Sequence, residues 1–480
     1  MARIAWFSPL PPVKSGIAMY CSELLPALAA EHKIDVFVDG PPAAIESPHE
    51  RLQLFSAHDF IWKNLAHPYD LVVYQLGNAP CHDYMWAYAV RYPGLVVLHD
   101  GQLHHARARM LLQQRHPRRE DYRREFRFNH PDAHPDLAEL GAVGLLGSLT
   151  YLWPMLRIIV ESSRHLLVHN EWLAESIRQA HPGAAIDVVE MGVPAPAPLA
   201  GARGQIRSRH GISEDAVLFT ALGKVTPEKR LREAIRALAS IVETAPHAHL
   251  LVAGETVDYY DLQAEAERLD VSTRVTISGY VSDDEIDNYV AASDVCLCMR
   301  WPTSRETSAS WLRCLAAGKP TISTDLVHTG DIPTLDPRNW SVLAGLKAST
   351  TTDADATPGD ADGIPTEEGE IASEARPVGV SIDILDEGHS LKLALRRLAT
   401  DEKLRLALGS NARELWARRF KLETMVEGYR TAIARILQAA PRDADGLKTL
   451  PDHLRATGTE HAESLVKEIL GPEYHLRDAD

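Results

Sequence analysis

Short, uninterrupted apolar runs alternate with longer amphipathic stretches along most of this sequence. Continuous apolar runs are typical of parallel strands that are buried on both faces, and the stretches between them have the length of connecting helices. In the first part of the chain the expected strands are Ile4–Phe7, Ile34–Val38, Leu71–Tyr74, Leu95–Leu98, His165–Val168 and Ile186–Val189. The pattern therefore predicts an α/β fold built on parallel sheets.

The pattern stops once, at the proline-rich stretch 192–198, and then begins again. Alternating prolines stiffen a chain and are typical of a connector between domains. Beyond this stretch the expected strands are Val217–Leu222, Leu250–Val252, Val275–Ile277, Val295–Leu297 and Thr321–Ser323. Two copies of the pattern predict two doubly wound, Rossmann-like domains that face each other across a cleft, with ligands at the carboxyl ends of the strands.

Domain ranges follow from these patterns. The predicted divisions are a first domain over 1–193, a linker over 194–212, a second domain over 213–410, a terminal helix over 411–440 that crosses back to the first domain, and a polar tail over 441–480. A segment over 346–376 interrupts the second domain. Residues 348–375 hold eight acidic side chains and no basic one, so we expect a solvated, disordered loop there.

Charge and cysteine content exclude some classes of protein. The chain has 50 Lys and Arg against 66 Asp and Glu, a net charge of −16. Proteins that bind nucleic acid usually have a basic balance, so we expect no nucleic-acid partner. The five cysteines are sparse and lack the paired spacing of a zinc site. Together with a start that has no secretory layout, they indicate a cytoplasmic protein.

Candidate functional residues of the first domain follow its strands. Gly16 begins a helix after the first strand, where backbone N–H groups can approach an anion. His99 and Asp100 follow the fourth expected strand, and His104 and His105 come one turn later. A plain βα turn is the alternative interpretation for Gly16, and a metal site is an alternative for the histidines and Asp100.

A loop in the second domain combines a glycine with two cations. Gly223, Lys224 and Lys229 follow the strand Val217–Leu222 and precede a helix. Point charges beside a helix N-terminus are well suited to a diphosphate group. The alternative interpretation is a surface loop whose lysines are solvated. The phosphate-binding pattern of nucleotide triphosphatases and the dinucleotide fingerprint are both absent from the sequence.

A second loop of this kind lies near residue 306. Glu306 can accept hydrogen bonds from sugar hydroxyls, and Thr307 or Ser308 can cap the helix that follows. Alternatively, Glu306 offsets only the neighbouring arginines. Asp-Ala-Asp occurs in the acidic segment and the tail but not after an apolar strand, so we expect no metal site.

In their order along the chain, these motifs resemble those of the retaining glycosyltransferases of family four, which have the GT-B fold. The resemblance covers about residues 1–345 and 377–437. The motifs that carry it are the loop ending at Gly16, Asp70–Asn78, Leu98-His99-Asp100, Val168-His169-Asn170, the Gly223–Lys229 loop, Arg300 with Glu306-Thr307-Ser308, and Gly318-Lys319-Pro320. The resemblance implies transfer of a sugar from a nucleotide-sugar to a hydroxyl acceptor with retention, without a cofactor or an obligatory metal.

The resemblance also assigns roles to residues. It implies that Lys224 and Lys229 hold the diphosphate leaving group, although the family usually has Arg at the first position. It places His99 and Glu306 at the transferred sugar. It implies further donor contacts at Gly16, Gly223, Tyr280, Thr307 and Ser308. A second glutamate of the family, which usually holds the nucleotide ribose, is replaced here by Arg313.

The charge and the apolar composition of residues 107–156 bear on contact with a membrane. Eight arginines lie within 107–127, and the following stretch 140–156 has no charge. A basic segment beside an apolar one favours peripheral contact with an anionic membrane on its cytoplasmic side. The alternative is a solvated helix followed by a core helix.

The leading interpretation is a glycosyltransferase of the hexosyltransferase type that acts on a saccharide or lipid-linked acceptor, in cell-surface polysaccharide synthesis. One alternative is an inactive GT-B protein that binds a nucleotide-sugar or a partner as a scaffold. Another is a GT-B enzyme of sugar phosphates, such as an epimerase or a phosphorylase.

Overall fold

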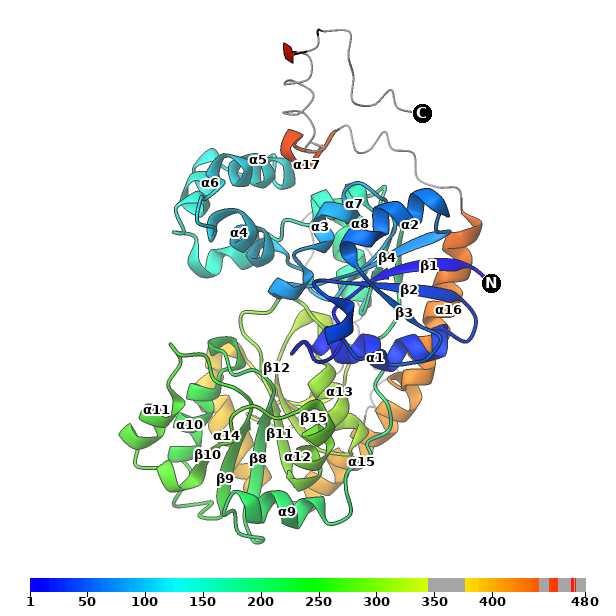
Figure 1. The fold of residues 1–480 in the computed structure, drawn as a ribbon. Coiled ribbons are helices and arrows are strands. Elements are labelled where there is room, and N and C mark those ends of the chain that lie inside the picture. Colours follow the sequence, from blue (N-terminus) through cyan, green and yellow to red (C-terminus); the bar gives the residue numbers. More distant parts are fainter. Residues whose placement is uncertain (344–375, 440–448, 456–467, 470, 472–480) are drawn as a thin grey trace, which may run out of the picture. The chain divides into compact units, whose positions relative to one another are not determined.

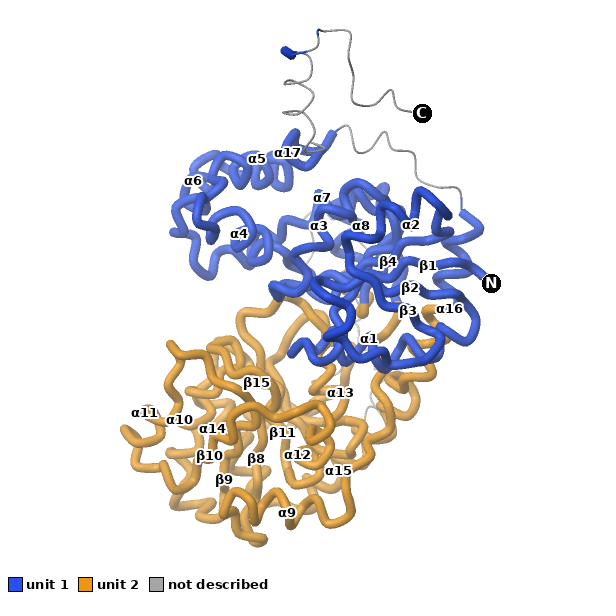
Figure 2. Tube along the Cα trace, in the orientation of Figure 1, with its two compact units in different colours: residues 1–168, 174–188, 430–480 blue, residues 169–173, 189–429 orange. Residues whose placement is uncertain are grey.

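The computed structural model describes residues 1–343, 376–439, 449–455, 468–469 and 471. Almost all of the predicted acidic loop and most of the predicted tail lie outside these residues. The chain forms two compact units (Figure 2). Unit 1 comprises residues 1–168, 174–188 and 430–480, and unit 2 comprises residues 169–173 and 189–429.

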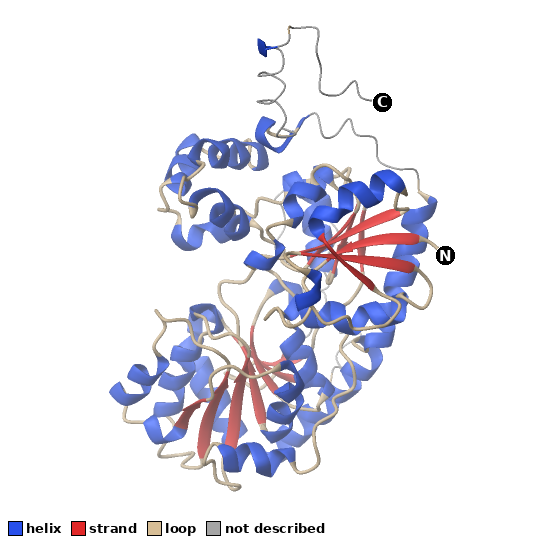
Figure 3. Ribbon diagram, in the orientation of Figure 1, coloured by secondary structure: helices blue, strands red, loops and turns tan. Residues whose placement is uncertain are grey.

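Unit 1 contains a seven-stranded parallel sheet with helices on both faces (Figure 3). Its strands are β1 (Arg3–Phe7), β2 (Lys33–Val38), β3 (Gln53–Ser56), β4 (Leu71–Leu76), β5 (Leu95–Leu98), β6 (His165–Val168) and β7 (Ile186–Val188), in the order β3-β2-β1-β4-β5-β6-β7. The flanking helices are α1 (Gly16–Leu28), α2 (Phe60–Ala66), α3 (Met85–Ala89), α7 (Arg157–Ser162) and α8 (Glu171–Ala180). The order reverses beside β1, so the carboxyl ends of β1 and β4 border the switch point where such sheets bind ligands.

One strand of this sheet was not predicted. β3 lies at the edge of the sheet and pairs only with β2 among the described strands. Its four residues are exposed or half-buried, because an edge strand does not need a continuous apolar run. His99 therefore follows the fifth strand of the chain, and the prediction that it follows the fourth was wrong.

A helical insert separates β5 from β6. It consists of α4 (His104–Leu112), α5 (Arg119–Asn129), α6 (Pro135–Ala142) and the 3₁₀ helix η4 (Gly147–Leu152), which lie beside the sheet of unit 1 (Figure 1). The insert has its own small core, which includes Leu111, Phe126 and Met155. The apolar stretch 140–156 is thus broken into several short elements, and the expectation of a single core helix there was wrong. No described helix has the length and apolar character that spanning a membrane requires.

The short helix α17 (Asp452–Arg455), from the predicted tail, packs on this insert. The Nε2 atom of His453 lies 2.7 Å from Oε1 of Glu125, which is buried and also pairs with Arg107. Leu450 is buried as well. This part of the tail is therefore integrated into unit 1.

Unit 2 contains an eight-stranded sheet that is parallel except for the pair β13–β14. Its strands are β8 (Val217–Leu222), β9 (Ala248–Ala253), β10 (Val275–Ile277), β11 (Val295–Cys298), β12 (Thr321–Thr324), β13 (Thr334–Leu335), β14 (Val342–Leu343) and β15 (Gly379–Ile382), in the order β10-β9-β8-β11-β12-β15-β13-β14. Its helices are α9 (Ala202–Arg209), α10 (Leu231–Ala239), α11 (Leu262–Arg268), α12 (Ile286–Ala292), α13 (Ala309–Ala316), α14 (Glu387–Thr400), α15 (Glu402–Arg419) and the first part of α16 (Leu422–Gln438). Two Rossmann-like units are thus present, as predicted.

Part of the predicted linker is folded. The helix α9 packs on α12, and its Arg207 is completely buried. The Nη2 atom of Arg207 lies 2.7 Å from Oδ2 of Asp294, and its Nη1 atom donates to the carbonyl of Ser213. A buried guanidinium needs such partners, so the end of the expected connector is a fixed part of unit 2.

Candidate functional site

The loop after β8 brings a glycine and a lysine together. Gly223 has a φ of +83°, which a residue with a side chain rarely adopts. A Cβ atom at this position would also lie 3.2 Å from Nζ of Lys229 and 3.9 Å from Oγ of Ser310. Gly223 therefore lets the lysine and the first turn of α13 approach the end of β8.

Lys229 ends the 3₁₀ helix η5 (Pro227–Lys229), and its ammonium group donates to the carbonyl of Leu222. Burial, reinforced by the nearby positive charge of Arg300, lowers the pKa of Lys229 to about 7. Among the described residues no carboxylate forms an ion pair with Lys229, and a partly desolvated cation in this situation has a strong preference for a bound anion.

Arg300 and Glu306 form the next part of the site. Arg300 follows β11, and its backbone N–H donates to Oγ1 of Thr324 at 3.0 Å. Its Nε atom lies 2.6 Å from Oε1 of Glu306, and Oγ1 of Thr303 donates to the other carboxylate oxygen at 3.1 Å. Glu306 is thus held in place by Arg300, which matches the alternative interpretation, and its role toward a sugar stays a prediction.

The helix α13 begins next to these residues. Ser308 is its N-cap, and the hydroxyl accepts a hydrogen bond from the backbone N–H of Trp311 at 3.3 Å. Thr307 precedes the cap. The remaining free N–H groups of the first turn and the partial positive charge of the helix end favour an anion. Lys229, Arg300 and this helix end together give unit 2 a site suited to a diphosphate.

Two other predicted donor residues lie farther out. Lys224 is exposed directly after Gly223. Tyr280 follows β10, two strands away from β8, and its side chain is 49% exposed. Desolvation and the nearby Asp283 raise the pKa of Tyr280.

Arg313 occupies the place of the expected second glutamate. It is buried in α13, and its Nη1 atom lies 3.9 Å from Oδ1 of Asp287 on α12. The same carboxylate accepts a hydrogen bond from the backbone N–H of Ala197 through Oδ2. Arg313 therefore links α13 to α12.

In unit 1, His99 is buried at the end of β5. Its Nε2 atom lies 2.7 Å from Oε1 of Gln75, which belongs to β4, and its ring packs edge-on against Tyr20. Gly16 is the first residue of α1, and a Cβ atom there would meet no atom within 4 Å. Packing therefore does not explain the glycine, whereas the close approach of a ligand would.

The other polar groups near His99 have separate partners. Oδ2 of Asp100 accepts from the backbone N–H of Asn78 at 2.7 Å. Nδ1 of His104 lies 2.8 Å from the carbonyl of Trp153, and Nε2 of His105 lies 3.1 Å from Oγ1 of Thr150. Across the described residues, no group of three or more His, Cys, Asp or Glu side chains is arranged to hold a metal ion.

Sequence reasoning missed two supporting residues. Arg300 belonged to the motifs of the resemblance and was considered as a counter-charge to Glu306, but it was given no role toward the diphosphate, although it closely follows the strand β11. Arg230 was included in the lysine loop without a role. Its guanidinium pairs with Glu387 of α14, with Nε 2.8 Å from Oε1, and this pair fixes the loop that carries Lys229.

Comparisons with known proteins agree with this geometry. Residues 202–330 match the family model of glycosyl transferases group 1. The chain is 26% identical over 119 residues to alpha-monoglucosyldiacylglycerol synthase of Streptococcus pneumoniae, which is 25% of this chain and 26% of that protein. It is 31% identical over 137 residues to mannosylfructose-phosphate synthase of Agrobacterium fabrum, which is 27% of this chain and 29% of that protein. The chain thus spans less than a third of the length of these relatives.

Solved structures match over nearly the whole chain. Sucrose-phosphate synthase from Thermosynechococcus elongatus superimposes with a TM-score of 0.60 and 15% identity, covering 92% of this chain and 100% of that one. Anabaena HepE in complex with UDP and glucose gives a TM-score of 0.56 and 15% identity, covering 91% and 100%. At these identities the match shows the fold, which is the GT-B fold that the resemblance implied.

Proposed function

We propose that this chain is a glycosyltransferase that moves a sugar from a nucleotide-sugar donor to a hydroxyl acceptor. The observation that carries the proposal is the convergence of Gly223, Lys229 and the first turn of α13 on one place in unit 2. This place lies within the residues that match the group 1 glycosyl transferases.

The chemistry follows from the charges. Departure of a nucleoside diphosphate builds negative charge on phosphate oxygens in the transition state. Lys229, Arg300 and the N–H groups of α13 are already oriented when that charge develops, so they stabilise it without reorganisation. Because cationic side chains and a helix end supply this stabilisation, we propose that the reaction needs no metal. Retention of the anomeric configuration is part of the same proposal.

The acceptor and the cellular role are proposed from fewer observations than the donor site. A relative is named for a lipid product and another for a phosphorylated sugar product, so both a lipid-linked and a saccharide acceptor stay within the proposal. A role in cell-surface polysaccharide synthesis on the cytoplasmic side of a membrane fits either acceptor. In the insert, however, Arg107, Arg109, Arg118, Arg123, Arg124 and Arg127 each pair with a carboxylate. The arginine cluster is therefore a weaker membrane anchor than its sequence indicates.

A thermal-shift and turnover experiment tests the proposal. A ligand that binds only the folded state raises the melting temperature, so UDP, GDP, TDP and ADP are screened. Lys229→Ala should abolish the shift and raise the barrier to transfer by roughly 2–4 kcal/mol, as loss of a preorganised charge does. Lys403→Ala, an exposed lysine on α15, is the control and should change neither quantity. Normal turnover in folded Lys229→Ala would refute the site.

One observation favours a second function. Arg313 stands where the family has the glutamate that holds the ribose, and it is engaged with Asp287. A protein without that contact could bind a nucleotide-sugar or a partner and act as a scaffold. Binding of a nucleoside diphosphate without any release from the matching nucleotide-sugar would support the scaffold.

A further inference from the structure

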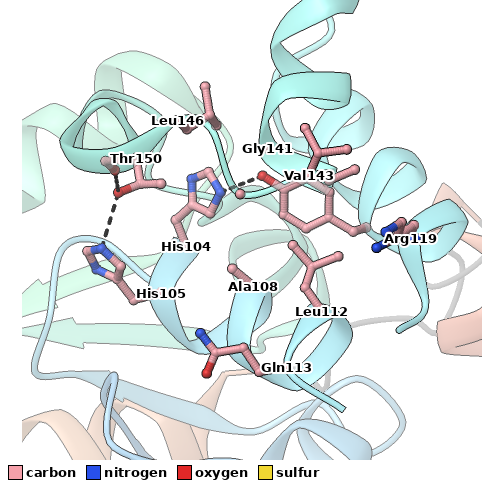
Figure 4. Close-up of a pocket in the computed structure, with 14 residues that line it drawn as sticks. His104, His105, Ala108, Leu112, Gln113, Arg119, Gly141, Val143, Leu146 and Thr150 are labelled. Carbon is pink, nitrogen blue, oxygen red and sulfur yellow. Dashed lines mark hydrogen bonds between the residues drawn. The ribbon is translucent and has the colours of Figure 1, made fainter. Parts of the chain in front are cut away.

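The helical insert of unit 1 contains a pocket of about 410 Å³ between α4, the start of α5, the end of α6 and η4 (Figure 4). A volume of this size is within the range of small-molecule sites. Its lining contains none of the residues of the diphosphate site in unit 2.

The inner wall of the pocket is uncharged. Apolar side chains of Ala108, Leu112, Ala142 and Leu146 line it. His104 and Tyr122, which also line the pocket, have partners already: Nε2 of His104 lies 2.7 Å from the hydroxyl of Tyr122, and its Nδ1 atom lies near the carbonyl of Trp153. Burial lowers the pKa of His104 to about 4, so the ring is neutral at physiological pH. Such a wall suits an alkyl chain.

Arg119 gives one side of the pocket a positive charge (Figure 4). It is exposed, and within the described part of the chain no carboxylate forms an ion pair with it, unlike six other arginines of the insert. The lining also includes no Asp or Glu, although the whole chain has a net charge of −16. The charge at this position is therefore complementary to an anionic group.

The segment around the pocket exposes large apolar side chains. Val143, Leu145, Leu149 and Leu152 are all more than half exposed within ten residues. Exposed apolar side chains that gather in this way usually mark an interaction site. Val143 lines the pocket together with Arg119, so an exposed apolar side chain and a cation border the same cavity, which is the pattern of a membrane-interface contact.

The pocket adjoins the end of β5. Nε2 of Gln102 donates to the carbonyl of Thr150, which lines the pocket, at 3.2 Å. The backbone carbonyl of Gln102 accepts from the side chain of Asn78 at 2.5 Å, and Asn78 follows β4. Thr150 in the pocket lining is thus connected through Gln102 to the loop that follows β4.

We propose that this pocket binds the alkyl chain of a phosphate-bearing membrane lipid, with the phosphate at Arg119 and the rim leucines in the bilayer surface. The inference deepens the proposed function, on which it rests, by naming a lipid-linked phosphate as the class of acceptor. A second copy of the chain on the same surface is a competing occupant that the experiment separates.

The test uses the full chain, one fluorescent probe and three competitors. A dansyl-labelled undecanoate should fluoresce more strongly on binding, and dodecyl phosphate should displace it. Inorganic phosphate should not displace it, and dodecyltrimethylammonium should do so about fivefold less well, as expected for one engaged cation. Ala108→Phe, which fills the pocket from a half-exposed position, should abolish binding, and Arg119→Glu should remove the preference for phosphate.

The rim is tested with phosphatidylglycerol vesicles. Leu145→Glu should reduce co-sedimentation, whereas Leu65→Glu on α2 is a matched control, because both leucines are 69% exposed. Retained probe binding in folded Ala108→Phe would overturn the proposal, and so would self-association that Leu145→Glu abolishes. The thermal shift with nucleoside diphosphates should persist in all four variants. Absence of this thermal shift from the wild type would refute the proposed function. The displacement assay tests the pocket independently of that result.

Discussion

At the scale of single residues, the proposed reaction depends most on the side chain of Lys229. The sequence predicted that it meets a diphosphate, from its spacing to Gly223 and from the resemblance. Its contact with the carbonyl of Leu222 and its closeness to Arg300 could not be predicted, because they depend on how the loops after β8 and β11 fold toward each other. Likewise, His99 was selected from its place after a strand, whereas its partner Gln75 comes from a neighbouring strand 24 residues earlier.

The pKa of Lys229 predicts how UDP binding depends on pH. The free site has a pKa of about 7, and a bound diphosphate favours the charged lysine and raises that value. Between pH 7 and the ordinary pKa of a lysine, binding therefore takes up a proton. Affinity should fall above pH 7, by at most about tenfold per pH unit.

Isothermal titration calorimetry in buffers of different ionisation enthalpy measures this proton uptake. Lys229→Arg keeps its charge throughout the range and should flatten the profile. An affinity that is unchanged between pH 7 and pH 9 in the wild type would show that Lys229 does not titrate at the site.

At the scale of elements, most strands were predicted from their apolar runs, and the exceptions have physical reasons. β3 and β14 lie at sheet edges and contain exposed residues, so they lack the pattern of a buried strand. β13 and β15 were not predicted either: β13 has only two residues, and Gly379 and Ser381 interrupt the apolar pattern of β15, although all four of its residues are buried. The stretch 140–156 has the composition of a core helix but folds into α6, a turn and η4. Gly144 and Gly147 both have positive φ angles, which a continuous helix does not permit.

The cap of α13 gives a prediction that separates stability from binding. Ser308→Ala removes the acceptor of the Trp311 N–H and should cost about 1 kcal/mol of unfolding free energy. Asp261→Ala removes the equivalent cap of α11, where the carboxylate accepts from Ala264 at 2.9 Å, and should cost a similar amount. Urea unfolding and UDP titration are measured for both variants. Only Ser308→Ala should weaken UDP binding, and equal affinities would remove α13 from the site.

The contact between α13 and α15 gives a second prediction at this scale. A Cβ atom on Gly409 of α15 would lie 2.2 Å from the carbonyl oxygen of Gly318, directly after α13. Gly409→Ala should therefore push the helices apart and destabilise the protein by roughly 1–3 kcal/mol. Gly388→Ala on α14 meets no atom within 4 Å and should leave stability unchanged or raise it by up to about 1 kcal/mol. A Gly409→Ala variant as stable as the wild type in urea would contradict this packing.

At the scale of the whole molecule, the sequence predicted two Rossmann-like domains because the strand–helix pattern occurs twice. It also placed a terminal helix over 411–440 that crosses back to the first domain, but it gave no partner to the polar tail over 441–480, of which α17 packs on unit 1. Periodicity identifies elements, but it carries no information on which distant segments pack together. The packing of His453 against Glu125, 328 residues away in sequence, is an example.

The central claim is that unit 2 positions a nucleotide-sugar so that its diphosphate can leave without a metal. The most direct measurement is the release of nucleoside diphosphate from UDP-, GDP-, TDP- and ADP-glucose by the purified chain, in the presence of EDTA. We expect release from at least one donor, its loss in Lys229→Ala and its persistence in Lys403→Ala. No release from any donor, or release that EDTA abolishes and manganese restores, would contradict it.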